Sequence, residues 1–162
     1  SKAYSMTGWR IGYAAAPLQV AKAMADLQGH STSNPTSIAQ EASVAALNGE
    51  QAPTGRMVAE FARRRDYMLS RLLSIPGITC ARPGGAFYLY PNVKHYFGKS
   101  FRGKKINSAT DLTSVLLDEA QVAVVPGIAF GNDNYMRFSY ACSMENIREG
   151  LRRFTALLEE IK

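Results

Sequence analysis

The sequence predicts a protein of the α/β class, with α+β character in its second part. Apolar residues make up 46% of the chain and charged residues 20%, a balance typical of a packed globular core. Helical periodicity dominates the first third, whereas short strands alternate with helices further on. The length of 162 residues suits about one domain.

The first part of the chain predicts one strand and two helices. We expect a strand over 9–16, ended by Pro17, and helices over 18–28 and 36–47. A glycine follows each helix, at the position where glycine commonly ends one.

A long helix is expected over 56–75, after the small break that Pro53 and Gly55 mark. This helix begins a new packing unit. The candidate domain boundary therefore lies near residue 52, which gives the parts 1–52 and 53–162.

The second part then predicts short strands and two further helices. A helix over 108–120 opens with Ser108-Ala109-Thr110-Asp111, which has the spacing of a capping box, and Ser143 caps the last helix. The expected strands cover 78–81, 86–90, 122–125 and 135–141. The core face of the last helix repeats every three or four residues, at Met144, Ile147, Leu151, Phe154, Leu158 and Ile161.

Composition excludes several classes of protein. The formal charge of +6 favours anionic partners in general. No apolar run approaches the ~20 residues of a membrane span, and no signal peptide is recognisable. Cys80 and Cys142 form no zinc-binding pattern, so no metal is expected, and two isolated thiols favour a reducing, cytoplasmic location.

The beginning of the chain carries the residues best suited to a catalytic or cofactor-binding role. Lys2 lies eight residues before Arg10, with small residues between them. A lysine amine can lose its proton near neutral pH and attack an aldehyde, and the planar fork of an arginine can bind two phosphate oxygens. From spacing alone, two solvated surface side chains are the commoner outcome.

The residues around this pair resemble a known family. The run Met6-Thr7-Gly8-Trp9-Arg10-Ile11-Gly12 resembles the cofactor-lysine segment of the class I and II aminotransferases. The runs 122–127 and Arg137-Phe138-Ser139-Tyr140 resemble the same family, and the resemblance extends over essentially the whole chain. Ser37-Ile38-Ala39-Gln40 is closest to the bacterial aspartate aminotransferase-like branch.

The resemblance implies the C-terminal portion of a fold type I transferase that depends on pyridoxal 5'-phosphate. Residues 1–52 would be the remnant of the large cofactor-binding domain. Residues 53–162 would be the small domain, with helices packed on a small, mostly antiparallel sheet. The implied substrates are an amino acid such as aspartate and a 2-oxo acid. The full-length protein would be a homodimer that binds neither nucleic acid nor membrane.

The resemblance also implies a role for each candidate residue. Lys2 would hold the cofactor as a Schiff base and then act as general base at the substrate Cα. Arg10 would bind the cofactor phosphate, with Ser1 as a weaker phosphate ligand. Arg137 would form a two-pronged salt bridge with the substrate α-carboxylate. An outward-facing surface arginine is the alternative at that position.

Two weaker resemblances leave alternatives open. Phe87 would lie beside the substrate pocket, or it is a core aromatic residue on a strand. Residues 31–34 match a family segment near the dimer interface, where they approach the partner's cofactor phosphate, or they cap the next helix.

In the family, the aspartate that pairs with the pyridine nitrogen, the ring-stacking aromatic and other phosphate ligands precede the lysine. No such positions precede Lys2 in this sequence. We therefore expect the chain alone to bind the cofactor poorly and to be inactive.

Other functions stay open at this point. A second interpretation is a non-catalytic dimerisation or binding module with an aminotransferase-like fold. The basic segment 94–105 carries five Lys/Arg and three aromatics, a composition that single-stranded nucleic acid surfaces use, although a solvated loop is the commoner explanation. Relatives with this fold also catalyse β-elimination, ring closure or decarboxylation at the same lysine.

Overall fold

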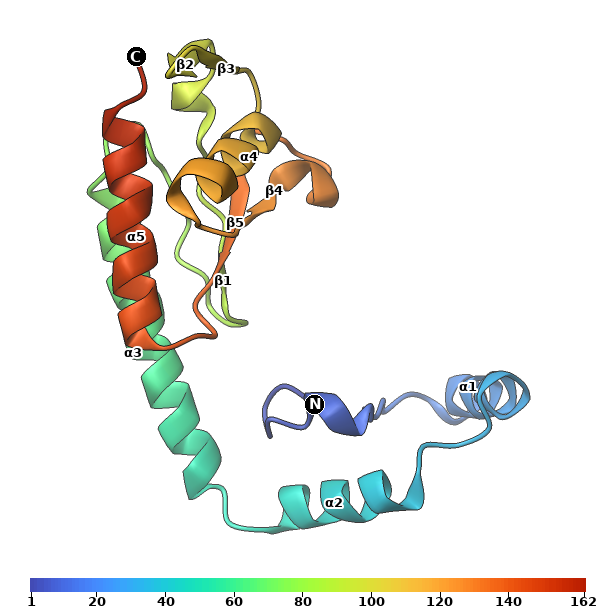
Figure 1. Ribbon diagram of the computed structural model, residues 1–162. Helices are drawn as coiled ribbons and strands as arrows, with labels where there is room; N and C mark the ends of the chain where they lie inside the picture. The colour runs from blue at the N-terminus through green and yellow to red at the C-terminus, as the bar shows by residue number, and fades with distance from the viewer. The chain divides into compact units, whose positions relative to one another are not determined.

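The computed structural model describes all 162 residues and divides the chain into two compact units, Ser1–Met57 and Val58–Lys162. Figure 1 shows the helices and strands along the chain, and each unit is described by itself below. The division falls inside the long helix α3 (Ala52–Leu73), which begins at Ala52 rather than at the expected residue 56.

The first unit consists of helices and irregular segments. It contains the 3-10 turn η1 (Thr7–Trp9), α1 (Leu18–Ser31), α2 (Ser37–Asn48) and the first residues of α3. The Thr36 side chain caps α2 by accepting a hydrogen bond from the Ala39 amide at 3.4 Å. Ala39 is the single buried residue of this unit, so the unit has no hydrophobic core of its own.

The strand expected over 9–16 is wrong. Residues 7–9 form a 3-10 turn, and 11–17 have no regular structure. Arg10 takes the left-handed conformation, with φ 53°, which interrupts an extended run. A strand also needs a neighbouring strand to satisfy its backbone groups, and the first unit contains none.

The second unit is built on a three-stranded antiparallel sheet with the order β1-β5-β4. These strands are short: β1 (Tyr88–Leu89), β4 (Val125–Pro126) and β5 (Met136–Ser139). The expected strand over 78–81 is reduced to a single bridge from Thr79 to Asn92. The small antiparallel sheet predicted from the sequence is confirmed, although its strands are shorter than expected.

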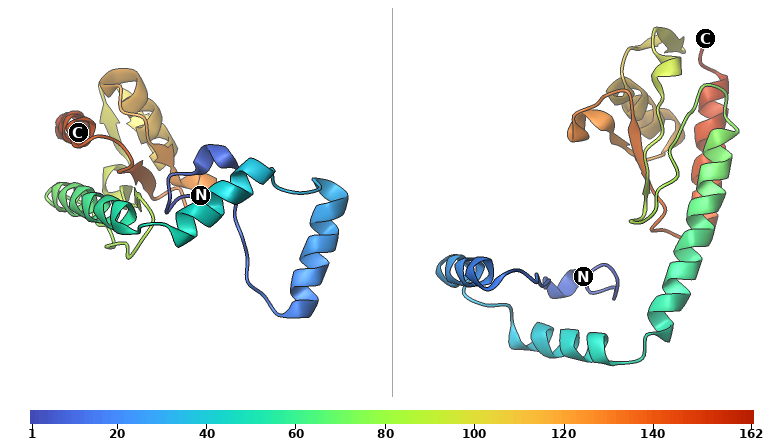
Figure 2. Two further views of the ribbon diagram at one scale, coloured as in Figure 1. Left: turned by 90° about the horizontal axis from the view of Figure 1, so that it is seen from below. Right: turned by 180° about the vertical axis from the view of Figure 1, so that it is seen from behind.

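Three helices complete the second unit. The second half of α3 runs alongside α5 (Met144–Glu159) in both figures, and α4 (Ala109–Ala120) contacts α5, β3 and β4 (Figures 1 and 2). The Phe138 and Phe154 rings meet edge to face, with centroids 5.1 Å apart, inside a continuous buried cluster. Burial of this cluster supplies the main stabilising free energy of the unit.

The two predicted helix caps are confirmed. The Ser108 hydroxyl accepts a hydrogen bond from the Asp111 amide at 3.0 Å, and the Asp111 carboxylate accepts one from the Asn107 amide at 2.8 Å. The Ser143 hydroxyl accepts a hydrogen bond from the Asn146 amide at 3.1 Å. Each cap satisfies backbone donors that a helix start leaves without a partner.

The basic segment 94–105 is structured rather than a plain loop. It contains the 3-10 turn η2 (Lys94–Tyr96) and most of the hairpin of β2 (Lys99–Phe101) and β3 (Lys104–Ile106). Gly98 and Gly103, both with positive φ, form the turns of this segment. The sequence alone did not predict these turns. None of the helices is both long enough and apolar enough to span a bilayer.

Candidate functional site

Lys2 lies in a tight turn that two backbone hydrogen bonds close. The Met6 amide donates to the Ser1 carbonyl at 2.7 Å, and the Ser5 amide donates to the Lys2 carbonyl at 3.3 Å. Ser5 adopts the left-handed conformation, with φ 55°, which reverses the chain. The turn therefore presents an exposed Lys2 on a fixed backbone.

Side chains anchor this turn within the first unit. The Tyr4 hydroxyl donates to Gln51 Oε1 at 3.0 Å, and the Ser5 hydroxyl donates to Met57 Sδ at 3.3 Å. Both partners lie close to the start of α3. The Lys2 turn is thus tied to the helix that leads out of the unit.

Arg10 lies at the end of η1, close to the Lys2 turn. Its Nη1 donates to the Thr7 carbonyl at 3.0 Å, which orients an exposed side chain back along the turn. The Ser1 hydroxyl donates to the Ile11 carbonyl. Because Ser1 and Ile11 are the direct neighbours of Lys2 and Arg10, this hydrogen bond holds the two candidate residues on adjacent backbone segments.

These residues fit a cofactor that carries both an aldehyde and a phosphate. The Arg10 guanidinium has five N–H donors and uses one of them on Thr7, so its remaining donors can meet phosphate oxygens. Lys2 supplies a primary amine, and Ser1 lies beside it with a hydroxyl that bonds to Ile11. The donor set therefore suits pyridoxal 5'-phosphate.

Arg137 lies in the second unit, on the middle strand of the sheet. Its Cζ atom is 4.3 Å from the centroid of the Tyr88 ring and 4.6 Å from that of the Phe130 ring. The side chain is half-buried, and it makes no hydrogen bond or ion pair with the protein. Arg137 is therefore a cation held by aromatic rings and without an anionic partner.

The strand register explains this position. Tyr88 pairs with Ser139, and Val125 pairs with Arg137, so these residues share one face of the sheet. Met136 and Phe138 alternate with Arg137 and are buried in the core on the other face. Arg137 therefore lies on the face of the sheet that points away from the core, and its guanidinium contacts two aromatic rings.

Two side chains that contact Arg137, Tyr88 and Phe130, were not predicted from the sequence. Tyr88 belongs to a strand where every second residue is expected to face the core, and Phe130 follows a turn after the expected strand 122–125. The alternation of Tyr88 and Leu89 was the available signal for the first of them. No sequence signal placed Phe130, because its contact with Arg137 depends on the turn geometry of η3 (Gly127–Phe130).

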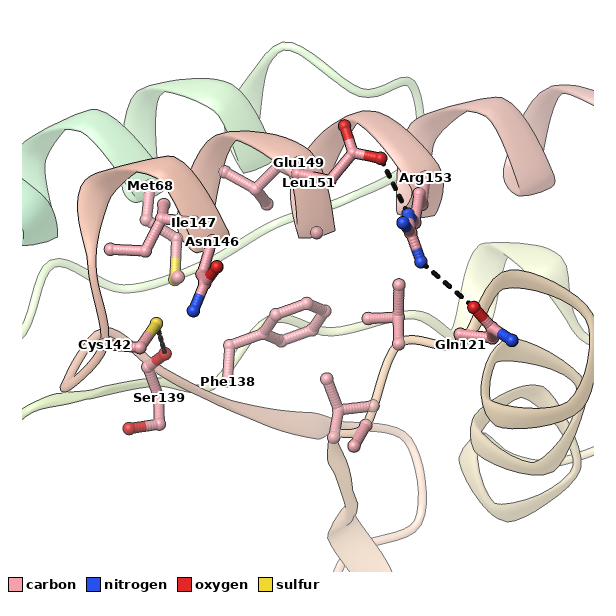
Figure 3. A pocket seen from close by; sticks show the side chains of 14 residues that line it. Met68, Gln121, Phe138, Ser139, Cys142, Asn146, Ile147, Glu149, Leu151 and Arg153 are labelled. Atoms are coloured by element: carbon pink, nitrogen blue, oxygen red, sulfur yellow. Dashed lines mark hydrogen bonds and ion pairs between the residues drawn. The ribbon is translucent and has the colours of Figure 1, made fainter.

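A separate pocket of about 440 Å³ lies between α5, β5 and the segment after α4 (Figure 3). Its wall includes Phe138, Cys142 and Asn146, and Arg153 bridges Glu149 and Gln121 at its rim. Burial raises the pKa of the Cys142 thiol, so the thiolate is disfavoured there. None of the three predicted site residues lines this pocket.

The weaker candidates have ordinary structural roles within their units. Phe87 is half-buried, and its ring meets that of Tyr88 at a tilt of 49°, with centroids 4.3 Å apart, and also contacts Phe61. The cap of α2 is Thr36, so the cap expected within 31–34 is wrong by a few residues.

Two of the three aromatic residues of the basic segment 94–105 are buried, and Phe97 is partly buried. Tyr96 and Phe101 are buried, and therefore cannot stack on bases. Arg102 and Lys104 both pair with Glu119, at 3.5 and 2.9 Å. The buried aromatic side chains and these ion pairs therefore attach the segment to the rest of the second unit.

Helices packed on a small antiparallel sheet match the C-terminal part of a fold type I transferase. Comparison with known proteins gives the family. The chain belongs to the family described as "Aminotransferase class I and II", whose sequence model matches residues 1–154. This family depends on pyridoxal 5'-phosphate, the cofactor that the sequence predicted and that the Lys2 and Arg10 donors suit.

Individual relatives agree with this assignment. The chain is 45% identical over 159 residues to an aspartate aminotransferase of Geobacillus stearothermophilus, which covers 98% of the chain and 39% of the relative. It is 51% identical over 154 residues to a probable aspartate/prephenate aminotransferase of Rickettsia bellii, with coverage of 94% and 39%.

A solved structure shows the same fold. The crystal structure of the aspartate aminotransferase from Rhizobium meliloti superposes with a TM-score of 0.94 at 46% identity, covering 99% of this chain and 40% of that one. The chain thus spans about 40% of the length of the relatives that it resembles.

Proposed function

We propose that this chain is the C-terminal part of an aminotransferase that moves an amino group between an amino acid such as aspartate and a 2-oxo acid. The observation that carries the proposal is the closure of Ser1 onto Ile11, which holds Lys2 and Arg10 on adjacent segments. Family membership over residues 1–154 supports it. The same support favours a cytoplasmic protein that forms a homodimer at full length.

Lys2 is proposed as the catalytic residue. When bound, the cofactor supplies an electron sink for the negative charge that develops at the substrate Cα. The Lys2 amine would hold the cofactor and, once the substrate amine has released it, would act as general base that takes the proton from that Cα. Backbone hydrogen bonds fix the turn of residues 1–6, so the backbone position from which the Lys2 side chain extends is defined.

The two arginines are proposed as anion-binding residues. Arg10 binds the cofactor phosphate with the donors that its bond to Thr7 leaves available. Arg137 binds the substrate α-carboxylate, which supplies the anionic partner that its guanidinium lacks in the fold. Lysine would serve less well at either position, because it cannot donate two parallel hydrogen bonds.

The two parts of the chain are proposed to divide these tasks. Residues 1–52 belong to the large cofactor-binding domain and carry Lys2 and Arg10. Residues 53–162 form the small domain, begin with the linking helix α3 and carry Arg137. Transamination is the reaction that we propose, because the relatives named above are aminotransferases.

An absorbance titration tests the cofactor assignment. We expect the chain to give the long-wavelength band of a lysine-bound cofactor at millimolar pyridoxal phosphate, and Lys2→Ala to lose it. Lys22→Ala, which removes an exposed lysine of α1, is the matched control and should keep the band. Arg10→Gln should weaken binding about tenfold, since a charged hydrogen bond contributes about 1.5–3 kcal/mol.

Retention of the full band in Lys2→Ala would contradict the proposal. A tight, stoichiometric band in the unaltered chain would overturn the expectation of poor binding while it supports Lys2.

A further inference from the structure

We propose that Tyr88 and Phe130 are positioning residues that hold the Arg137 guanidinium in one plane, ready for two-pronged binding of a carboxylate. We call these two side chains the aromatic clamp. The inference rests on the proposed function, which assigns a carboxylate to Arg137. It adds the residues that orient this arginine.

The contacts of the clamp come from two different elements. Tyr88 lies on β1 and Phe130 ends the turn η3, and their ring centroids lie 4.3 and 4.6 Å from the Arg137 Cζ atom. Each ring also contacts other aromatic side chains, Phe87 for Tyr88 and Tyr90 for Phe130. β1 and β4 flank β5 on opposite sides in the sheet, and η3 directly follows β4, so the two rings come from opposite sides of the strand that carries Arg137.

This arrangement favours one use of the arginine. Ring faces attract the flat face of a guanidinium, whereas its N–H groups lie in the plane and point to its edge. With the rings against its faces, the guanidinium would present its edge, where a carboxylate binds with two parallel hydrogen bonds. A long side chain that is already oriented loses less conformational entropy when the ligand binds.

The fold fixes the Phe130 side of the clamp through its turn. The Gly127 amide donates to the Tyr135 carbonyl at 2.8 Å, and the Asn132 amide donates to the Gly127 carbonyl at 3.1 Å. These hydrogen bonds close the segment between β4 and β5 over the strand that carries Arg137. Tyr90 meets the Phe130 ring edge to face, with centroids 6.0 Å apart.

Core packing does not account for Phe130. The side chain is 48% exposed, and its ring contacts Tyr90 and the Arg137 guanidinium. The charge of Arg137 is likewise left without a carboxylate from the protein. A structural arginine usually has such a partner, so the exposed ring and the unpaired cation together point to a ligand.

The test follows the Arg137 side chain directly by NMR. The ¹⁵N-labelled chain gives an Nε–Hε signal for Arg137, which is assigned by its loss in Arg137→Lys. The signal is recorded alone and during titration with succinate, at constant ionic strength adjusted with chloride. In the unaltered chain we expect an upfield ring-current shift of Hε, and a saturable movement as succinate binds.

Phe130→Leu is the main variant, because Phe130 is exposed and leucine should not disturb folding. Phe130→Leu and Tyr88→Leu should each lose the part of the ring-current shift that their own ring causes, and each should weaken succinate binding about five-fold, the range of a cation–π contact. Phe130→Tyr and Tyr88→Phe keep the rings and should restore both readouts. Ile128→Ala, an exposed change in the same turn, is the matched control.

The outcomes separate the clamp from the proposed function. If succinate moves the Arg137 signal equally in the unaltered chain and in both leucine variants, the carboxylate role stands and the clamp is refuted. If succinate does not move the signal even in the unaltered chain, the proposed role of Arg137 fails, and the clamp fails with it. Loss of affinity in the leucine variants, with rescue by the aromatic ones, supports the clamp.

Discussion

The two units of the chain differ in how they are held together. The second unit contains a continuous cluster of buried side chains from three helices and the sheet. The first unit buries only Ala39, and its apolar side chains, such as Leu27 at 72% and Ile38 at 77%, stay exposed. Arg137 therefore rests on a packed scaffold, whereas Lys2 and Arg10 rest on local hydrogen bonds.

The difference shows that helix formation and stability are separate matters. Helices α1 and α2 have helical sequences, and α2 has an N-cap. Isolated helices of this length are marginal in water, because most helical stability in proteins comes from packing of one face. We therefore expect the second unit to unfold cooperatively and the first to contribute little to that transition.

A core truncation is the strongest test of this comparison. Phe154 is fully buried against Phe138, so Phe154→Ala removes a large side chain and leaves a cavity. We expect a loss of about 4 kcal/mol in the free energy of unfolding. Leu27→Ala, at an exposed position of the first unit, should change it by less than about 0.5 kcal/mol.

Urea unfolding followed by far-UV circular dichroism measures both variants. A large loss for Leu27→Ala would mean that the first unit has its own stabilising packing, which would contradict the comparison.

The turn that carries Phe130 gives the next largest effect. A Cβ atom at Gly127 would lie 2.5 Å from the Tyr135 carbonyl oxygen and closer still to that of Asn132. Because backbone atoms cannot move aside cheaply, Gly127→Ala should lower the free energy of unfolding by about 2 kcal/mol.

A second glycine in the same unit serves as the control for that variant. Gly150 lies within α5, with open space around its Cβ position. Gly150→Ala should raise the free energy of unfolding by about 0.5–1 kcal/mol, since alanine favours helix. Equal losses at both glycines would show that local space does not decide the outcome.

The N-caps of α2 and α5 are both side-chain hydroxyls, so the same kind of substitution can be compared in the two units. Ser143→Ala removes the cap of α5 and should cost about 1 kcal/mol in global unfolding. Thr36→Ala removes the cap of α2 and should leave global unfolding unchanged, with faster amide exchange confined to α2. Hydrogen exchange resolved by peptide distinguishes the two, and a global effect of Thr36→Ala would couple α2 to the core.

The smallest effect concerns acid stability. Arg152 and Arg153 donate hydrogen bonds to the Glu149 carboxylate, which lowers its pKa from 4.5 to about 2. This contribution is present above the unfolded pKa of 4.5 and is lost as the pH falls toward about 2. The groups are exposed, so the effect is small and weakens with salt.

Thermal unfolding at stepwise lower pH tests this expectation. Glu149→Gln should have a shallower loss of melting temperature over the same window than the unaltered chain. A slope that the variant leaves unchanged would show that these ion pairs contribute nothing to folding.

Local sequence signals predicted the helices well. Caps and periodic apolar residues act over a few neighbours, so α4 and α5 and their caps at Ser108 and Ser143 were found from sequence. The strands were found less well, because pairing depends on distant residues. The run 9–16 has the composition of a strand but no neighbouring strand in its unit, and it is irregular.

The residues of the candidate site were likewise predicted only in part. Lys2, Arg10 and Arg137 were chosen from residue type and from resemblance, and their roles stay predictions. Tyr88 and Phe130 were missed, because they meet Arg137 through strand register and a turn. Such contacts leave no regular spacing in the sequence.

Reductive labelling tests most directly that Lys2 is the cofactor residue. The chain is incubated with less than one equivalent of pyridoxal phosphate, reduced with borohydride, digested and mapped by mass spectrometry. We predict that the pyridoxyl label lies mainly on Lys2 and that Arg10→Gln reduces this preference. A label spread evenly over Lys2, Lys22, Lys94, Lys99 and the other lysines would contradict the assignment.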